Sequence, residues 1–381
     1  MGNEWSCFVH SILLRITYTG DYIKKSNENA IFLKRGGEWM RGNGSEDKNW
    51  KRDEEMVSFT KEEKQLITYI KEKTAIANMD NISRTRTYQQ YYLRNKEVEW
   101  SFLASMVSRN AGWNMTDLEG ENYSNILSKG MRQQLFLTYE KANCLIFLDA
   151  YPQLLLYEES KKRNRTFFHL LPSFYVSVFM EKEWNRFWRE RNKKRLMIAL
   201  IINEQNKIQK PVIENRYIQS RVLDRLLFKM QERFHLNAVV FPTLEGDLYG
   251  FSVTGFENVK KRIELGKKLA WLLFHPKYKE LFYDFALHTI PTGSRLDYEQ
   301  YFKGMKGYRT PQLREVFSIV PPARQDPLDW FHSYTNVENF FIVKEPQEKI
   351  DVTTWFLKKQ RKIHYIASFI SFRKRFNSFV L

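Results

Sequence analysis

Apolar residues recur at helical spacing along most of the chain, and this pattern limits the fold more than any other feature. From Trp184 to Ile208 the sequence has neither Gly nor Pro, so we expect one continuous helix there. Between Tyr217 and Phe234 apolar residues lie four apart on one stripe, which predicts another helix. Similar patterns predict helices over about 131–151, 257–274 and 276–288. The sequence therefore predicts a mainly α protein.

Capping residues, glycines and prolines mark where these helices should begin and end. Thr60 and Glu63 fit a capping box ahead of an apolar pattern, so we expect ordered structure to begin near residue 60. Pro152 should end the helix before it, because proline cannot donate the next backbone hydrogen bond. We expect Gly112 to end the helix that carries residues 100–107.

One stretch is typical of β structure, and the N-terminal part follows neither pattern. Two β-rich runs flank a turn-like Leu-Glu-Gly-Asp at 244–247, which predicts a short hairpin near 239–253. Residues 1–58 are rich in Gly and alternating charge, so we expect a partly disordered N-terminal appendage. The remaining residues, 59–381, should form a single large helical domain that ends in a basic helix over 352–376.

Cysteine content and hydropathy favour a cytoplasmic protein. The two cysteines, Cys7 and Cys144, exclude a disulfide framework and a cysteine-rich zinc site. Cys144 lies in an apolar helix-like stretch, as expected of a buried structural thiol. The apolar run Leu196–Ile202 is far shorter than the roughly 20 residues needed to cross a bilayer. The N-terminus lacks the features of a secretory signal, so we expect neither export nor a transmembrane segment.

The net charge of +17 is unevenly distributed. Residues 161–195 hold eleven basic and three acidic residues, and residues 352–381 hold seven basic residues and no acid. This excess predicts a non-catalytic binding protein for an anionic partner, with nucleic acid as the first candidate and an anionic lipid surface as the second. The proposed basic surface comprises Lys161, Lys162, Arg163, Arg191, Lys194, Arg195, Lys358, Lys359, Arg361, Arg373, Lys374 and Arg375.

Both basic segments leave two interpretations open. On a helix, Trp184, Trp188 and Arg191 share one face, which suits stacking with nucleic-acid bases. The same tryptophans could instead be core residues, with arginine stems packed over them. The C-terminal segment could dock on an anionic membrane, or it could pack on the protein body and expose its cations. Its apolar residues do not collect on one clean face.

A second candidate site is a polar cluster that brackets residues 100–107. Arginine and asparagine offer forked donors for a carboxylate or phosphate, and Asp117 could orient one of them. The same residues also suit a helix C-cap and the turn after it. The alternative function is therefore an enzyme or ligand-binding protein for a small anionic metabolite. The candidate ligand-binding residues are Arg84, Arg86, Arg109, Asn110, Trp113, Asn114 and Asp117.

Strong enzyme motifs are missing from the sequence. It contains no GxxxxGK[ST] loop, no GxGxxG after a strand, no HExxH and no GxSxG. The seven histidines never fall within five residues of one another, so we expect no metal site and no cofactor. Asp297 and Glu299 could serve acid–base chemistry, or they could belong to a solvated loop. Whether the protein is an enzyme is therefore left open.

One long stretch has a recognisable likeness. Residues 81–120, NISRTRTYQQYYLRNKEVEWSFLASMVSRNAGWNMTDLEG, resemble the uncharacterised YppC-like family of Bacillus and related Firmicutes, domain of unknown function 2515. The likeness continues through LPSFYVSVFMEKEWNRFW and HPKYKELFYDFALHTIPTGSRLDYEQYF, so it covers most of the chain from about Asn81. It implies a bacterial cytosolic protein. It carries over no activity, cofactor or catalytic residue, because none is assigned to the family.

Overall fold

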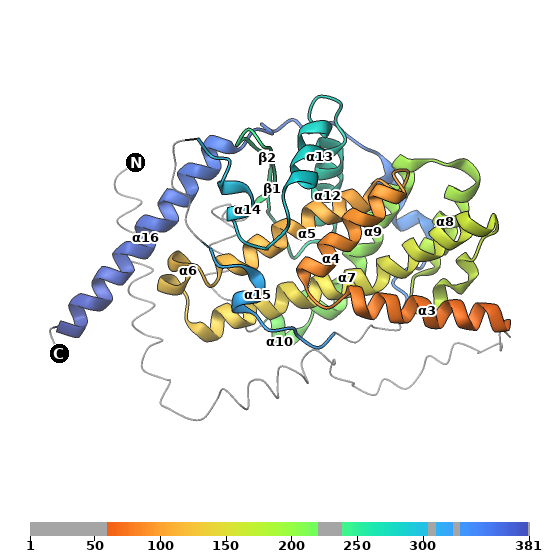
Figure 1. Cartoon of the computed structure of the whole chain (residues 1–381), viewed down its shortest axis with the longest axis horizontal. Coiled ribbons are helices and arrows are strands. Elements are labelled where there is room, and N and C mark those ends of the chain that lie inside the picture. The colour runs from red at the N-terminus through yellow and green to blue at the C-terminus, as the bar shows by residue number, and fades with distance from the viewer. Residues whose placement is uncertain (1–58, 220–237, 304–309, 323–327, 380–381) are drawn as a thin grey trace. The chain divides into compact units, whose positions relative to one another are not determined.

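A computed structural model describes residues 59–219, 238–303, 310–322 and 328–379, all of which fall within the unit Glu46–Leu381. In these residues the protein is mainly α, with a two-stranded antiparallel sheet, which confirms the predicted fold class (Figure 1). The predicted N-terminal appendage and most of the helix predicted over 217–234 lie outside the described residues. The division of the chain at residue 58 therefore stays a prediction.

The first half of the described chain contains long helices joined by short turns. The capping box at Thr60 is confirmed, since the Thr60 backbone N–H donates to Glu63 Oε2 at 2.8 Å and the Glu63 N–H donates to Thr60 Oγ1 at 3.2 Å. The helices are α3 (Lys61–Ala77), α4 (Asn81–Arg94), α5 (Trp100–Asp117), α6 (Glu121–Ile126) and α7 (Lys129–Arg163).

Two predicted helix ends are wrong. α7 continues through Pro152 to Arg163, because buried side chains on both sides of the proline hold the helix in the core despite the lost hydrogen bond. α5 continues through Gly112 to Asp117. A Cβ at Gly112 would lie 2.7 Å from Asn81 Oδ1 and 3.2 Å from Gly293 Cα, so the glycine permits close packing here rather than ending the helix.

The single helix predicted from Trp184 to Ile208 is also wrong. The segment forms α8 (Val178–Glu190) and α9 (Lys193–Lys207), which pack against each other. Arg191 takes the left-handed conformation at φ 56°, and Asn192 caps the second helix by accepting a hydrogen bond from the Arg195 N–H at 3.0 Å. An asparagine cap therefore divides the segment although it contains neither Gly nor Pro.

The second half of the described chain contains the predicted hairpin and shorter helices. Strands β1 (Ala238–Pro242) and β2 (Leu248–Ser252) pair with Val240 opposite Gly250, which confirms the hairpin. The helices predicted over 257–274 and 276–288 are present as α12 (Val259–Leu273) and α13 (Lys279–His288). The remaining helices are the 3₁₀-helix η2 (Phe168–Phe174), the π-helical turn η3 (Gln209–Ile213), α10 (Arg216–Ile218), α14 (Leu296–Glu299), α15 (Leu313–Val316), η5 (Tyr334–Asn336), η6 (Glu338–Phe341) and α16 (Thr353–Phe379).

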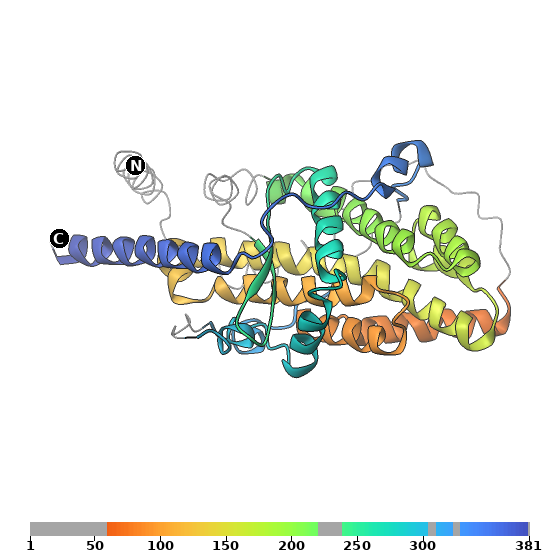
Figure 2. The same ribbon diagram turned by 90° about the horizontal axis from the view of Figure 1, so that it is seen from above.

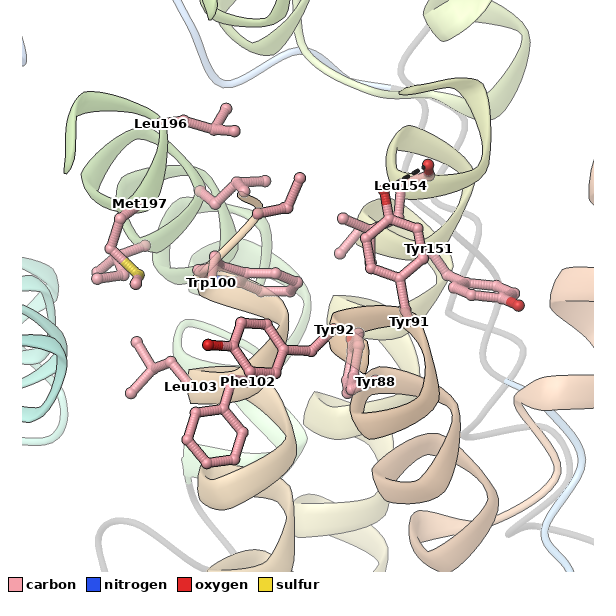
Figure 3. Close-up of a cluster of buried hydrophobic side chains, with 14 of the residues drawn as sticks. Tyr88, Tyr91, Tyr92, Trp100, Phe102, Leu103, Tyr151, Leu154, Leu196 and Met197 are labelled. Atoms are coloured by element: carbon pink, nitrogen blue, oxygen red, sulfur yellow. Dashed lines mark hydrogen bonds between the residues drawn. The ribbon is translucent and has the colours of Figure 1, made fainter. Parts of the chain in front are cut away.

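The core lies where α4, α5, α7 and α9 meet, and aromatic rings fill much of it (Figure 3). Tyr88 meets Trp100 edge to face with ring centroids 5.5 Å apart, and the Tyr91 hydroxyl donates to the Leu154 carbonyl at 2.9 Å. Cys144 is 1% exposed, as expected for a structural thiol. Among the described residues, no helix combines the length and apolarity that a membrane span requires.

Candidate functional site

The polar cluster predicted around α5 makes several separate contacts between elements. Arg84 is buried, and its Nη2 contacts Glu140 Oε2 at 2.6 Å, which joins α4 to α7. Its Nη1 donates to Asn78 Oδ1 at 3.1 Å. The Arg84 guanidinium is therefore engaged within the protein core.

Arg109 is also buried, but its partners are neutral oxygens. Its guanidinium donates to the Thr289 carbonyl at 2.8 Å, the Ala286 carbonyl at 3.0 Å and Gln89 Oε1 at 3.1 Å. Burial lowers the pKa of Arg109 to about 10. These contacts fasten α5 to the C-terminal end of α13.

The remaining members of the predicted cluster point to different neighbours. Asn110 holds strand β1, since its Nδ2 donates to the Val240 carbonyl and its Oδ1 accepts from the Val240 N–H, both at 2.8 Å. Trp113 Nε1 donates to Asp297 Oδ2 at 3.1 Å. Arg86 is exposed, and Asn114 is half-buried. Ligand binding by this set stays a prediction.

Asp117 belongs to a buried group of charges where α14 and α16 meet the end of α5. At its centre is Arg295, whose guanidinium lies 2.9 Å from Glu299 Oε1 and 3.5 Å from Asp117 Oδ1. Arg295 also donates to Gln360 Oε1 of α16 at 2.7 Å. We call Asp117, Arg295, Glu299 and Lys359 the charged cluster. Burial raises the pKa of Asp117 and of Glu299, although Arg295 opposes the shift in both cases.

Lys359 is the member of the charged cluster without a hydrogen-bond partner. The residue is 7% exposed, and its Nζ lies 4.4 Å from the centroid of the Trp355 ring. Burial lowers the pKa of Lys359 to about 7, the positive charge of Arg295 adds to the effect, and Asp117 opposes it. Glu299 Oε2 is likewise buried without a hydrogen-bond partner. The charged cluster therefore holds two unpartnered groups of opposite formal charge.

A second group of carboxylates, Asp149 of α7 and Glu204 of α9, lies between these helices. No pattern in the sequence predicted it. Asp149 Oδ2 accepts hydrogen bonds from Asn203 at 2.5 Å and from Gln153 at 2.7 Å, and Lys207 Nζ lies 3.7 Å from Oδ1. Burial raises the pKa of Asp149 to about 6 and that of Glu204 to about 7. The available signal was a single acid within the apolar run CLIFLDAY.

Most cations of the first basic segment contact carboxylates. Arg195 donates two hydrogen bonds to the buried Glu183, from Nε at 2.8 Å and from Nη2 at 2.9 Å. Lys161 Nζ lies 2.5 Å from a carboxylate oxygen of Glu97. Trp184 is fully buried, so it is a core residue. Three more cations, Lys162, Arg163 and Arg165, pair with Glu159 or Glu62. Arg191 stacks over the Trp188 ring at 4.6 Å, and Lys194 is exposed.

Helix α16 carries apolar residues on two opposite faces. One face packs mainly against α6 (Figure 2) and contains Phe356, Ile363, Ala367 and Ile370. Tyr365 follows Ile363 by two positions, or about 200° around the helix, so it lies on the opposite side. We call the exposed residues there the aromatic stripe: Tyr365 (71% exposed), Phe369 (48%), Phe372 (69%) and Phe376 (61%). This division explains why the apolar residues of the sequence did not form one clean face.

Cations accompany the aromatic stripe. Lys358, Arg361 and Lys362 are exposed, and Arg373 is half-buried. Lys374 is exposed, and its Nζ donates to the Asn125 carbonyl at 2.9 Å. The side chain of Arg375 lies outside the described residues. Because residues 352–381 contain no acid, no carboxylate within this segment offsets these charges.

Comparison with known proteins gives a family but no activity. The family described as "Protein of unknown function (DUF2515)" matches residues 76–357, which include Asp117, Arg295 and Glu299 and end in the first turns of α16. The chain is 46% identical over 303 residues to "Uncharacterized protein YppC" of Bacillus subtilis (strain 168), covering 79% of this chain and 94% of the relative. No solved structure shows significant similarity to the chain. The chain therefore belongs to the DUF2515 family, as its resemblance in sequence indicated.

Proposed function

We propose that this protein is a non-catalytic binding protein that attaches to an anionic lipid surface through α16. The observation that carries the proposal is the aromatic stripe, which is exposed on the helix face opposite the packed one. Helices with bulky apolar side chains on one face and lysines and arginines beside them lie in the plane of the membrane interface. Anionic headgroups would be the counterions of the α16 cations.

The positions of the cations around α16 suit this arrangement. Lys358 falls on the side of the helix that carries the stripe, and Arg361 and Lys362 flank it by about 50° on either side. Long basic side chains can keep their charges at the headgroup level while neighbouring rings enter the acyl boundary. A cation near an anionic membrane contributes about 1 kcal/mol. Burial of a phenylalanine contributes about 1.5–3 kcal/mol when complete, and correspondingly less at an interface.

The stripe favours lipid over nucleic acid. Its four rings extend over about 16 Å of helix length on one side. A nucleic-acid duplex would satisfy the cations through its phosphates but would offer no apolar layer for four adjacent rings. Single-stranded nucleic acid could stack on such rings, so it is the competing ligand in the test below.

The test compares binding of the full chain to vesicles of neutral phosphatidylcholine and to vesicles that also contain anionic phosphatidylglycerol. We expect co-sedimentation with the anionic vesicles at low salt. The triple variant Phe369→Ser, Phe372→Ser, Phe376→Ser should weaken this binding by about 100-fold, at roughly 1 kcal/mol for each partly buried ring. A matched control replaces three exposed apolar residues elsewhere, Ile290→Ser, Ile319→Ser and Ile342→Ser, and should bind as the wild type does.

Circular dichroism of both triple variants establishes that each one folds. Fluorescent single-stranded DNA and RNA are titrated with the same three proteins. The proposal is wrong if the wild type binds no anionic vesicle, or if the stripe variant and the control variant bind vesicles equally well. Binding to oligonucleotides without binding to vesicles would assign α16 to nucleic acid instead.

A further inference from the structure

The charged cluster distributes its hydrogen bonds unequally between its two cations. Arg295 contacts Glu299, Asp117 and Gln360 at 2.9, 3.5 and 2.7 Å. Lys359 Nζ is buried beside the same group and has no hydrogen-bond partner. A buried ammonium without a hydrogen-bond partner is costly, so the folded protein holds a larger fraction of the Lys359 amine in its neutral form than an exposed lysine would have. A neutral amine keeps a lone pair with which it can attack an electrophile.

One group that could transfer protons, the Asp117 carboxyl, lies near this amine. Asp117 is close enough to influence the charge of Lys359, and its own pKa is raised by burial. A buried lysine next to a second cation and near a group that can transfer protons is an arrangement that activates an amine for covalent catalysis.

We propose that Lys359 is the nucleophile of a site that captures a small neutral aldehyde or ketone as an imine, with Asp117 as the proton-transfer group. The Nζ lone pair attacks the carbonyl carbon, and a C–N bond forms. Both protons of the nitrogen pass, by way of the Asp117 carboxylate, to the former carbonyl oxygen, which leaves as water when the C–O bond breaks and the C=N bond forms. No oxidant or reductant is required.

The charges of the cluster select this class of ligand. An anionic ligand would meet Asp117 and Glu299, and a cationic ligand would meet Arg295. A neutral carbonyl compound avoids both repulsions. The side chain of Asp117 is 17% exposed, and Trp355, whose ring centroid lies 4.4 Å from Nζ, is 38% exposed. The site is independent of the proposed lipid surface, because Lys359 lies on the packed side of α16.

The test is reductive trapping on the full chain. The protein is incubated with acetaldehyde and cyanoborohydride between about pH 6 and pH 10, and labelled lysines are located by peptide mass mapping. At neutral pH we expect Lys359 to be labelled at least about tenfold faster than its exposed neighbours Lys358 and Lys362, because a larger fraction of its amine is neutral. Labelling of Lys359 should level off above about pH 8, whereas that of exposed lysines should keep rising towards pH 10.

Two variants and a second probe complete the experiment. At about pH 9, where the Lys359 amine is largely neutral with or without the Asp117 charge, Asp117→Asn should slow labelling of Lys359 and leave Lys358 unchanged. Lys358→Gln should leave Lys359 reactive. Glyoxylate, an anionic aldehyde, should label Lys359 more slowly than acetaldehyde does, relative to Lys358. The proposal is overturned if labelling follows exposure at every pH, with Lys358 and Lys362 modified and Lys359 spared. It is also overturned if Lys359 reacts no faster in the folded protein than in urea, a comparison that needs no variant.

Discussion

The two basic segments of this protein have similar compositions and opposite surroundings. Residues 161–195 and residues 352–381 both combine cations with aromatic residues. In the first segment Trp184 is fully buried and Arg195 is held by the buried Glu183. In the second, the aromatic stripe of α16 is exposed.

The two basic segments differ in their acidic residues rather than in their lysines and arginines. The first segment contains three acidic residues and meets others from distant elements, such as Glu62 and Glu97. The second segment contains none. A high count of lysine and arginine therefore identifies a binding surface only where carboxylates do not already occupy the cations. Its exposed aromatic stripe, rather than the state of its cations, makes α16 the better candidate surface.

The largest effect expected from this comparison concerns stability. Trp184→Ala should lower the free energy of unfolding by about 3–5 kcal/mol, because it empties a fully packed site and removes the hydrogen bond from Nε1 to Gln153. Phe372→Ala should change it by no more than about 0.5 kcal/mol, because the ring is 69% exposed. Urea unfolding followed by circular dichroism measures both. Comparable losses in the two variants would show that the stripe is packed in solution.

A smaller effect is expected when cations are removed from each segment in turn. Lys358→Gln, Arg361→Gln and Lys362→Gln together should weaken binding to anionic vesicles by about 2–3 kcal/mol at low salt and by much less at high salt. The matched variant Lys162→Gln, Arg163→Gln, Arg165→Gln should weaken it by less than about 1 kcal/mol, because Glu159 and Glu62 already pair with these cations. Equal losses in vesicle co-sedimentation would mean that only total charge matters.

Local signals in the sequence predicted much of the fold. The capping box at Thr60 and the hairpin turn near Gly246 each depend on residues close together in the chain, and both are confirmed. The predicted end at Pro152 was wrong because burial on both sides of the proline outweighs the lost hydrogen bond. The break at Asn192 was missed because an asparagine cap can begin a new helix without any Gly or Pro.

The candidate sites were less predictable, because they depend on which distant elements meet. Residue type alone selected Arg109, but its Nη1 and Nη2 donate to oxygens of residues 89, 286 and 289. Lys359 looked like one of several surface cations. Only the packing of α16 near Arg295, 64 positions earlier in the chain, buries it. No period or motif within residues 352–376 carries that information.

Lys359 is also the exception within the second segment, and the smallest predicted effect follows from it. Its pKa is about 7 in the folded protein and about 10.5 for an exposed lysine, as in the unfolded chain, so between these values the unfolded chain binds more protons. Stability should therefore rise with pH over this interval, by up to about 1.4 kcal/mol per pH unit, and should be lost as the pH falls towards 7.

Lys359→Met should remove this slope and be more stable than the wild type near pH 7. Lys358→Met, which changes an exposed neighbour, should keep the slope. Urea unfolding of the three proteins between about pH 7 and pH 9 measures it, and other titrating groups cancel in the comparison. An equal slope in the wild type and in Lys359→Met would mean that the amine reaches water in the folded protein, and the charged cluster would then have no neutral nucleophile.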